Sequence, residues 1–178
     1  MSPEVKRRRR GQAAFERKEA NRAVIKDTLD RCSKDPAMVQ RGHVCWLPGR
    51  VQREPCEDLP GKASIEIEIR NEDCVSVAEH YCRKDGASAW LLNSASASRP
   101  GGGVRSGCNA QEEHVCRCST LLPHLERAAA EGQYPLHRWR GKKQKVPDCG
   151  VLVHDEIEFL ASPSWAAPGR RRRDCRRL

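Results

Sequence analysis

The first periodic pattern of apolar positions is helical. Between residues 11 and about 33, Val24, Ile25, Thr28, Leu29 and Cys32 recur at intervals of three and four among charged residues. This spacing puts them on one face of an amphipathic helix. Repeated Pro and Gly then interrupt every period from 34 to 62, which predicts a long connection with one short extended piece at 44–46.

The next patterns predict a strand, a helix and a second strand. Residues 64–70 (SIEIEIR) alternate between apolar and charged side chains, as in a half-buried or edge strand. Asn71, Glu72 and Asp73 offer helix-capping side chains before a helix. The apolar run 87–93 has the length of a buried central strand. We therefore expect a βαβ unit, which places the loop 94–109 at the carboxyl end of a parallel strand, where open α/β sheets bind ligands.

Beyond this loop the patterns are shorter. Residues 110–122 predict a helix that starts near Gln111, and 131–145 are irregular and basic. The run 150–153 predicts a second buried strand, and 157–160 another short one. The order of elements indicates an α/β fold.

Composition and charge limit the classes of protein. A chain of 178 residues with 38% hydrophobic residues suits a single domain. The formal charge of +9 is concentrated in basic runs, so we interpret 1–10 as a basic N-terminal arm and 163–178 as a basic C-terminal tail. Such runs are usually solvated, and they can act in nuclear import or in polyanion contacts. Nucleic acid is a possible partner of these termini, but it is not favoured, because no aromatic residues are interleaved with the charges.

Cysteine content and hydropathy bear on location. The chain has 10 Cys, but its amino terminus carries charges where a secretory signal needs an apolar stretch, which favours a reducing compartment. No run approaches the roughly 18 apolar residues of a membrane span. We therefore expect an intracellular protein, cytoplasmic or nuclear, with no membrane partner.

One loop carries candidate chemistry. In Pro100-Gly101-Gly102-Gly103-Val104 the glycines let backbone N–H groups approach an anion closely. Alone, this Ser/Ala/Gly-rich stretch is equally typical of a flexible linker. However, it lies between a predicted strand and a predicted helix, and Gln111-Glu112-Glu113 follows after seven intervening residues. Without the loop, Gln-Glu-Glu would be an ordinary polar first helical turn.

This combination resembles the microbial-type poly(ADP-ribose) glycohydrolases of the macrodomain superfamily. The similarity covers roughly residues 12–155 and is strongest at 90–123, including Cys116-Arg117-Cys118-Ser119. It implies a macrodomain-like mixed sheet flanked by helices. The family continues with further strands where this chain has Pro163–Leu178, so we expect the domain, 11–162, to lack its C-terminal strands.

The resemblance also implies roles for individual residues. Glu113 matches the acid that protonates the leaving oxygen in an oxocarbenium-like cleavage. Glu112 points about 100° away along the helix and is expected to hold ribose hydroxyls. The remaining predicted ligand-binding residues are Gly101, Gly102, Gly103, Val104, Gln111, Asn93, Ser96 and Asp73. The three glycines are assigned to the diphosphate. Asn93 and Ser96 are assigned to the ribose pocket, although an Asn here is often only a turn former. Asp73 would lie near adenine or would simply cap a helix.

The chain departs from the family at two positions beside the loop. It has Ser94 where Phe is usual and Arg99 where Asn is usual; Arg99 would either contact phosphate or obstruct the pocket. His114, Cys116 and Cys118 raise the alternative of a metal site, but their spacing on one helix favours core positions for the cysteines. We predict no metal and no cofactor.

Three functions follow from this reading. The first is hydrolysis of poly(ADP-ribose) or related ADP-ribosyl O-glycosidic linkages. Its partners would be ADP-ribose, its polymer and ADP-ribosylated proteins. The second is a non-catalytic ADP-ribose-binding protein or pseudoenzyme, and the third is a basic protein whose termini bind polyanions.

Overall fold

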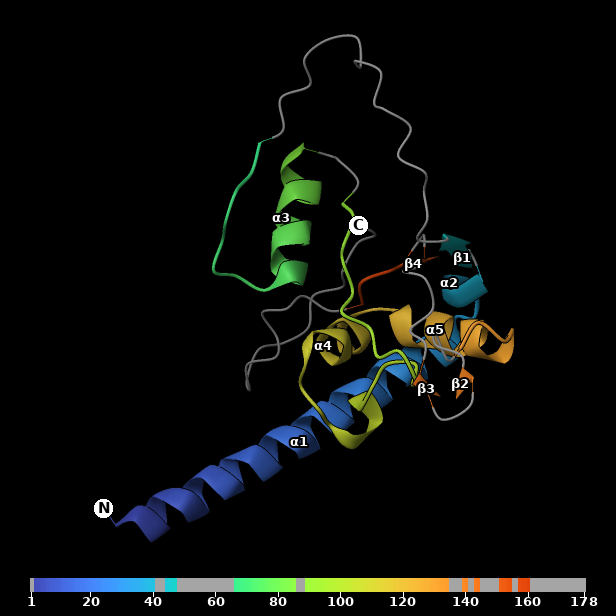
Figure 1. Cartoon of the computed structure of the whole chain (residues 1–178). Helices are drawn as coiled ribbons and strands as arrows, with labels where there is room; N and C mark the ends of the chain where they lie inside the picture. The colour runs from blue at the N-terminus through green and yellow to red at the C-terminus, as the bar shows by residue number, and fades with distance from the viewer. Residues whose placement is uncertain are drawn as a thin grey trace.

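The computed structural model describes residues 2–40, 44–47, 66–85, 89–134, 139–140, 143–144, 151–154 and 157–160. Helices dominate these residues (Figure 1). They are α1 (Pro3–Lys34), α2 (Ala37–Gln40), α3 (Cys74–Asp85), the 3-10 turn η1 (Val104–Ser106), α4 (Gln111–Cys118) and α5 (Leu121–Ala130). The strands are β1 (Val44–Leu47), β2 (Trp139–Arg140), β3 (Lys143–Gln144) and β4 (Val151–His154).

Helix α1 is the longest element, and it begins earlier than the apolar pattern predicts. The Ser2 side chain caps its first turn by accepting a hydrogen bond from the Val5 N–H, and Pro3 opens the helix, where its missing N–H is harmless. Only Ile25, Thr28 and Cys32 are buried, and they share one face in the second half. The predicted basic arm is therefore exposed, as expected for a solvated run, but residues 3–10 are the helical start of α1.

The predicted helix 110–122 is divided into two helices. A proline in a helix interior clashes with the carbonyl four residues earlier, which here would be Ser119. The chain avoids the clash because α4 ends at Cys118 and α5 starts at Leu121, leaving Pro123 in the first turn of α5. The Ser119 hydroxyl stabilises the break by donating to the Val115 carbonyl and accepting from the Leu121 N–H.

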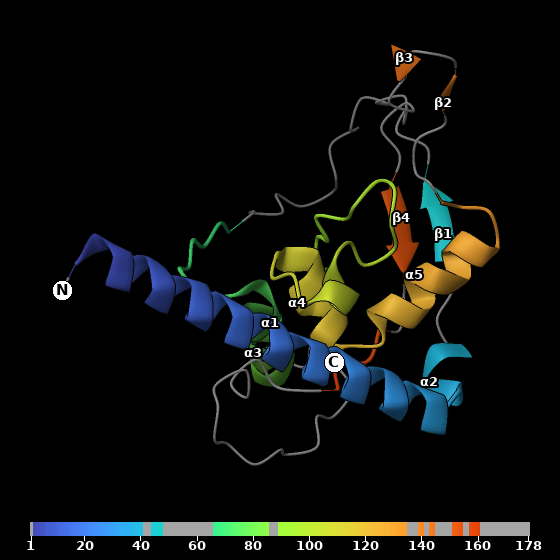
Figure 2. The ribbon, with the colours of Figure 1, turned by 90° about the horizontal axis from the view of Figure 1, so that it is seen from below.

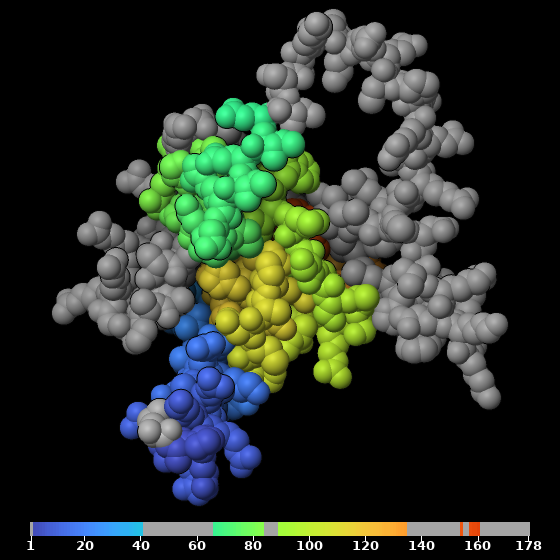
Figure 3. Space-filling model, turned by 60° about the vertical axis from the view of Figure 1, so that its left-hand side comes forward, coloured from blue at the N-terminus to red at the C-terminus, as the bar shows by residue number. Residues whose placement is uncertain are grey.

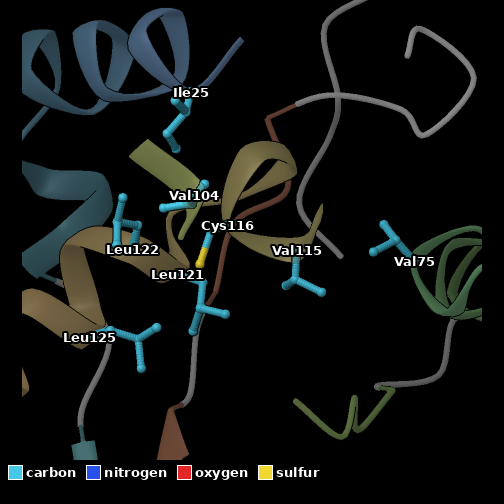
Figure 4. Packing of buried hydrophobic residues seen from close by; sticks show 8 residues of the cluster. All are labelled: Ile25, Val75, Val104, Val115, Cys116, Leu121, Leu122 and Leu125. Carbon is cyan, nitrogen blue, oxygen red and sulfur yellow. The ribbon is translucent and has the colours of Figure 1, made fainter. Parts of the chain in front are cut away.

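The core forms where α1, η1, α4 and α5 meet (Figure 4). Its buried members are Ile25, Val75, Val104, Val115, Cys116, Leu121, Leu122 and Leu125. A hydrogen bond of 2.7 Å from the Thr28 hydroxyl to the Arg117 carbonyl ties α1 to α4 inside it. The core thus supports the start of α4, which follows the glycine loop.

The expected α/β fold with a mixed, macrodomain-like sheet is wrong for the described residues. Their strands make two separate two-stranded antiparallel ladders, β1 with β4 and β2 with β3. The extended piece at 44–46 is confirmed as part of β1. Of the predicted strand 150–153, residues 151–153 are confirmed as part of β4, which pairs with β1, and residue 150 lies outside the described residues. The predicted strand 157–160 is reduced to a single bridge between Ser119 and Phe159.

The predicted βαβ unit is also wrong, although its helix is present. The described part of the first predicted strand, 66–70, has no regular secondary structure and pairs with no described strand. Its polar face contacts α3 instead: Glu68 pairs with Arg70 and bonds to the Tyr81 hydroxyl, and the Arg70 guanidinium lies over the Tyr81 ring. Its apolar face is therefore outside, with Ile69 94% exposed.

The second predicted strand fails in a similar way. Residues 89–93 have no regular secondary structure and pair with no described strand, and Trp90 is 85% exposed. Only Leu91 packs against the core. The expected loss of C-terminal family strands concerns residues 163–178, which lie outside the described residues. No described helix is long and apolar enough to cross a membrane.

Candidate active site

The glycine loop and the start of α4 line an open, shallow pocket of about 500 Å³. Figure 3 shows this part of the chain, in yellow and yellow-green, at the surface between α3 and α1. The lining residues are Ser94, Ala95, Ser96, Ser98, Arg99, Gly102, Gly103, Ala110, Glu112 and Glu113. Five residues predicted from the sequence thus lie at one pocket: Ser96, Gly102, Gly103, Glu112 and Glu113.

Glu112 links the N-terminal part of the glycine loop to α4. Its carboxylate accepts hydrogen bonds from the Ser96 N–H at 2.8 Å and from the Gly101 N–H at 3.2 Å. The Asn93 side chain also bonds to it. Glu112 is only 3% exposed, and this burial raises the pKa of its carboxyl group, while the Ser96 and Gly101 N–H groups lower it and neighbouring Glu113 raises it. Burial has the larger effect, so the proton is held more tightly than on an ordinary glutamate.

Glu113 links the C-terminal part of the glycine loop to α4 in the same way. Its Oε1 accepts from the Gly103 N–H at 2.9 Å, and its Oε2 accepts from the Ala110 N–H at 3.2 Å. The second bond is the glutamate half of a capping box at the start of α4. A Cβ on Gly102 would lie 2.7 Å from Glu113 Oε1 and 3.1 Å from Glu112 Oε2, so only glycine lets both carboxylates approach here.

The glycine N–H groups expected to hold a diphosphate have partners within the chain. Those of Gly101 and Gly103 donate to the two glutamates, and that of Gly102 donates to the Arg99 carbonyl at 3.0 Å. The Gln-Glu-Glu triplet and the three glycines therefore form one interlocked unit. Their roles toward a ligand stay predictions.

Three other predicted site residues are not among those that line the pocket. Gln111 accepts from the Ser94 N–H at 2.8 Å and donates to the Leu92 carbonyl at 2.9 Å, so it fixes the segment that leads into the loop. Asn93 bonds to Glu112 and leaves its buried Oδ1 without a hydrogen-bond partner in the described chain. The Val104 side chain is in the hydrophobic core.

Asp73 does not line the pocket. Its Oδ1 accepts from the Val75 and Ser76 N–H groups at 3.1 and 3.0 Å, and it lies 3.5 Å from His114 Nε2. Burial raises the pKa of the Asp73 carboxyl, but hydrogen bonds from the Ser76 hydroxyl and from the Ser76 and Val75 N–H groups, with the charge of His114, outweigh burial and lower this pKa. The helix-cap interpretation of Asp73 is confirmed, and the adenine contact stays a prediction.

Sequence reasoning missed Arg117 as part of the site. This guanidinium is 3% exposed, lies one helical turn after Glu113, and donates to the Cys108 carbonyl at 2.6 Å and to the Asn109 side chain. Cys108 and Asn109 connect η1 to α4, so Arg117 holds the segment that joins the glycine loop to the glutamates. The opposite charge four residues after Glu113 is the signal that could have indicated it.

Among the described residues, Arg99 is the one cationic side chain that lines the pocket. It is exposed, and its guanidinium makes no hydrogen bond or ion pair with any described residue. Its backbone N–H donates to the Ser96 hydroxyl at 3.2 Å. The chain therefore presents a free positive charge beside two buried carboxylates, at a position where the family usually has Asn.

The cysteines of α4 are core residues, as favoured from the sequence. Cys116 is in the hydrophobic cluster and Cys118 is buried. Burial, followed by the charges of Glu112 and Glu113, raises the pKa of the Cys116 thiol, which keeps it neutral. Among the residues that the structure describes, no three His, Cys, Asp or Glu side chains are grouped to hold a metal ion.

Comparison with known proteins identifies the family. The search of curated proteins and the search of solved structures each give no match. The model of the family described as microbial-type PARG, catalytic domain, matches residues 10–151, and PARG stands for poly(ADP-ribose) glycohydrolase. This range includes the glycine loop, the Gln-Glu-Glu triplet, the whole described pocket and most of the chain. The chain therefore belongs to the microbial-type poly(ADP-ribose) glycohydrolase catalytic domain family.

Proposed function

We propose that the pocket binds a terminal ADP-ribosyl unit and that the chain hydrolyses its O-glycosidic linkage, with poly(ADP-ribose) as the first substrate to test. Membership of the family suggests glycohydrolase activity. The observation that carries the proposal is the pair of adjacent, buried carboxylates held against one glycine loop. A volume of about 500 Å³ falls within the usual range of small-molecule sites, about 300–1,000 Å³.

The geometry leaves the carboxylates able to act on a ligand. Each carboxylate oxygen has two lone pairs, and each N–H bond from the loop uses only one of them. The loop thus holds both groups in place, while a ligand approaches from the pocket side. We assign proton donation to the leaving oxygen to Glu113 and the binding of ribose hydroxyls to Glu112.

The phosphate groups need positive charge close by. To bind phosphate oxygens, the N–H groups of Gly101 and Gly103 would have to leave carboxylate oxygens and that of Gly102 would have to leave the Arg99 carbonyl, whereas the Arg99 guanidinium needs no such exchange. We propose that the diphosphate lies along the wall formed by Gly102 and Gly103, with Arg99 as its charged partner. A charge-assisted hydrogen bond of this kind is about twice as strong as a neutral one.

A non-catalytic reader of ADP-ribose is the second candidate. It is favoured by one observation, namely that both glutamates already serve the structure of the loop. The same pocket could thus bind the ligand without turning it over. Such a protein would keep the phosphate and ribose contacts and lack proton transfer.

Two measurements on the wild-type chain separate these functions. Chromatography of labelled poly(ADP-ribose) after incubation shows whether ADP-ribose is released, and calorimetry with free ADP-ribose shows whether the monomer binds. Release of ADP-ribose supports the glycohydrolase. Binding without release at high protein concentration supports the reader, and neither binding nor release excludes both.

A further inference from the structure

The N-terminal half of α1 is a strongly charged surface next to the candidate active site. All side chains from Pro3 to Ala20 are exposed, and this stretch contains seven Lys or Arg and three Glu. Arg8 pairs with Glu4 at 3.3 Å. Lys6, Arg7, Arg9 and Arg10 make no ion pair with any described residue, so their charge is available to a partner.

The same helix is bonded to the turn that follows the glycine loop. The Asn21 side chain donates to the Gly107 carbonyl at 3.0 Å, and the Arg22 side chain donates to the Ser106 carbonyl at 3.3 Å. The backbone carbonyl of Lys18 also lies against Gly107. The charged half of α1 is therefore a continuation of the segment that supports the site, and it projects beyond the rest of the described chain (Figure 2).

Helical spacing shows which residues of the exposed half of α1 lie on the same face as its contact with Gly107. Residues 7, 11, 14, 18 and 21 follow intervals of four and three, so they share the face that Lys18 and Asn21 present to Gly107. This face carries Arg7 and is flanked by Arg10. Between Arg7 and Lys18 this face has only Gly11 and Ala14, whose side chains are small. A Cβ on Gly11 would meet nothing within 4 Å, so the helix surface is open there. At a rise of about 1.5 Å per residue, Arg7 is about 20 Å along the helix from Asn21.

From these contacts we infer that the exposed half of α1, residues 3–20, binds the polyanionic chain of poly(ADP-ribose) that continues beyond the unit in the pocket. This inference rests on the proposed function. The proposed site holds a single ADP-ribose unit, whereas a polymer carries a diphosphate in every unit and can extend along α1 to Arg7, about 20 Å beyond Asn21. The surface therefore distinguishes polymer from monomer, and it adds affinity through counterion release.

The family match starts at residue 10, so residues 3–9 of this surface lie outside it. Nucleic acid is the other polyanion that Lys and Arg would attract. We favour the ADP-ribose polymer because the charged face begins at the turn that holds the glycine loop. A single-stranded DNA is accordingly a comparison ligand in the test.

The test compares two charge-matched double variants of the full chain. Arg7→Gln with Arg10→Gln removes two charges from the proposed surface, and Lys26→Gln with Lys34→Gln removes two exposed charges from the other half of α1. All four positions are exposed, so folding should be unaffected. Fluorescence anisotropy measures the affinity for an ADP-ribose oligomer between 50 and 200 mM salt, and calorimetry measures the affinity for the monomer.

We expect only the arginine variant to lose oligomer affinity and salt dependence. Each phosphate contact contributes about 0.7 to the log–log salt slope of a single-stranded polyanion. Losing two contacts should lower the slope by about 1.4. The ratio of wild-type to variant affinity for the oligomer should therefore change about sevenfold between the lowest and the highest salt concentration. Monomer affinity should stay the same in both variants.

Three results would overturn the inference: unchanged oligomer affinity in the arginine variant, equal losses in both variants, or equal wild-type affinity for single-stranded DNA with the same number of phosphates. The proposed function fails differently. Oligomer binding that needs Arg7 and Arg10 but leads to no hydrolysis refutes the glycohydrolase alone, and hydrolysis without any effect of these residues refutes the surface alone.

Discussion

The contact between α1 and the turn after the glycine loop can be tested with one added methyl group. Gly107 ends η1 with φ of +81°, and a Cβ there would lie 2.4 Å from the Lys18 carbonyl oxygen. Gly132 has nearly the same φ, +80°, and a Cβ there would meet nothing within 4 Å. Gly107→Ala and Gly132→Ala therefore share the backbone cost and differ in the contact with α1.

The expected difference follows from these distances. A left-handed backbone costs an L-residue about 1–2 kcal/mol, so Gly132→Ala should lower the free energy of unfolding by that amount. In Gly107→Ala the new methyl group is about 1 Å closer than ordinary contact, and the opposing atom is backbone, which cannot rotate away. Overpacking adds about 1–3 kcal/mol, and losing the Asn21 hydrogen bond adds about 1 kcal/mol.

Urea denaturation of the two variants measures this difference directly. We expect Gly107→Ala to be less stable than Gly132→Ala by about 2 kcal/mol or more, with equal m values. Losses that agree within about 0.5 kcal/mol, the usual range for harmless surface changes, would mean that α1 does not contact Gly107.

Three further predictions concern the core, the titration of the site and its charge. Leu122→Ala should lower the free energy of unfolding by about 2–5 kcal/mol because Leu122 is fully buried. Ile69→Ala should lower it by less than about 0.5 kcal/mol because Ile69 is exposed; a large loss of stability in Ile69→Ala would support the strand predicted from the sequence. Burial raises the pKa of Glu112 above 4.5, so its contribution to stability is present at acidic pH and is lost as the pH rises through the folded pKa. The stability advantage of wild type over Glu112→Gln in urea melts should therefore shrink from pH 4.5 to neutrality, and a growing advantage would contradict the shift. Arg99→Asn should weaken ADP-ribose binding by about tenfold in calorimetry, corresponding to about 1.5 kcal/mol for a hydrogen bond to a charged group; unchanged affinity would remove Arg99 from the phosphate site.

Local features of the fold could be predicted because they depend on neighbouring residues. The Asp73 side chain caps α3, as its position before the helical pattern predicts. Helix α4 starts at Gln111, where the predicted helical pattern begins. Pro123 follows the predicted helix 110–122 and does not divide it by itself; the break follows from the helical segment continuing past Pro123 to Ala130. The extended pieces at 44–46 and 150–153 were recognisable from their apolar runs.

The partners of these elements could not be predicted in the same way. Alternation in 64–70 shows that one face is apolar and the other charged, but it does not show which face meets a neighbour. Contacts of Glu68 and Arg70 with Tyr81, a residue of α3, direct the charged face toward that helix. A strand also needs a partner, and no local pattern states whether β4 pairs with a parallel neighbour or with β1.

The same limit applies to the site. Spacing along the chain correctly predicted that the glycine loop and the glutamates lie together, because a loop before a helix returns to its first turn. It could not show that Glu112 and Glu113 accept the loop's own N–H groups. Nor could it show that Arg117 holds the connection at Cys108 and Asn109.

The most direct test of the proposed function is the rate of ADP-ribose release from labelled poly(ADP-ribose) by wild type, Glu113→Gln and Glu131→Gln. Glu131 is exposed at the end of α5, so it controls for the loss of one negative charge. General acid catalysis contributes about 10²–10⁴-fold. We therefore expect Glu113→Gln to release ADP-ribose at least about 100 times more slowly, while Glu131→Gln matches wild type. A Glu113→Gln chain that is folded and releases ADP-ribose at the wild-type rate would contradict the assignment of Glu113 as the acid.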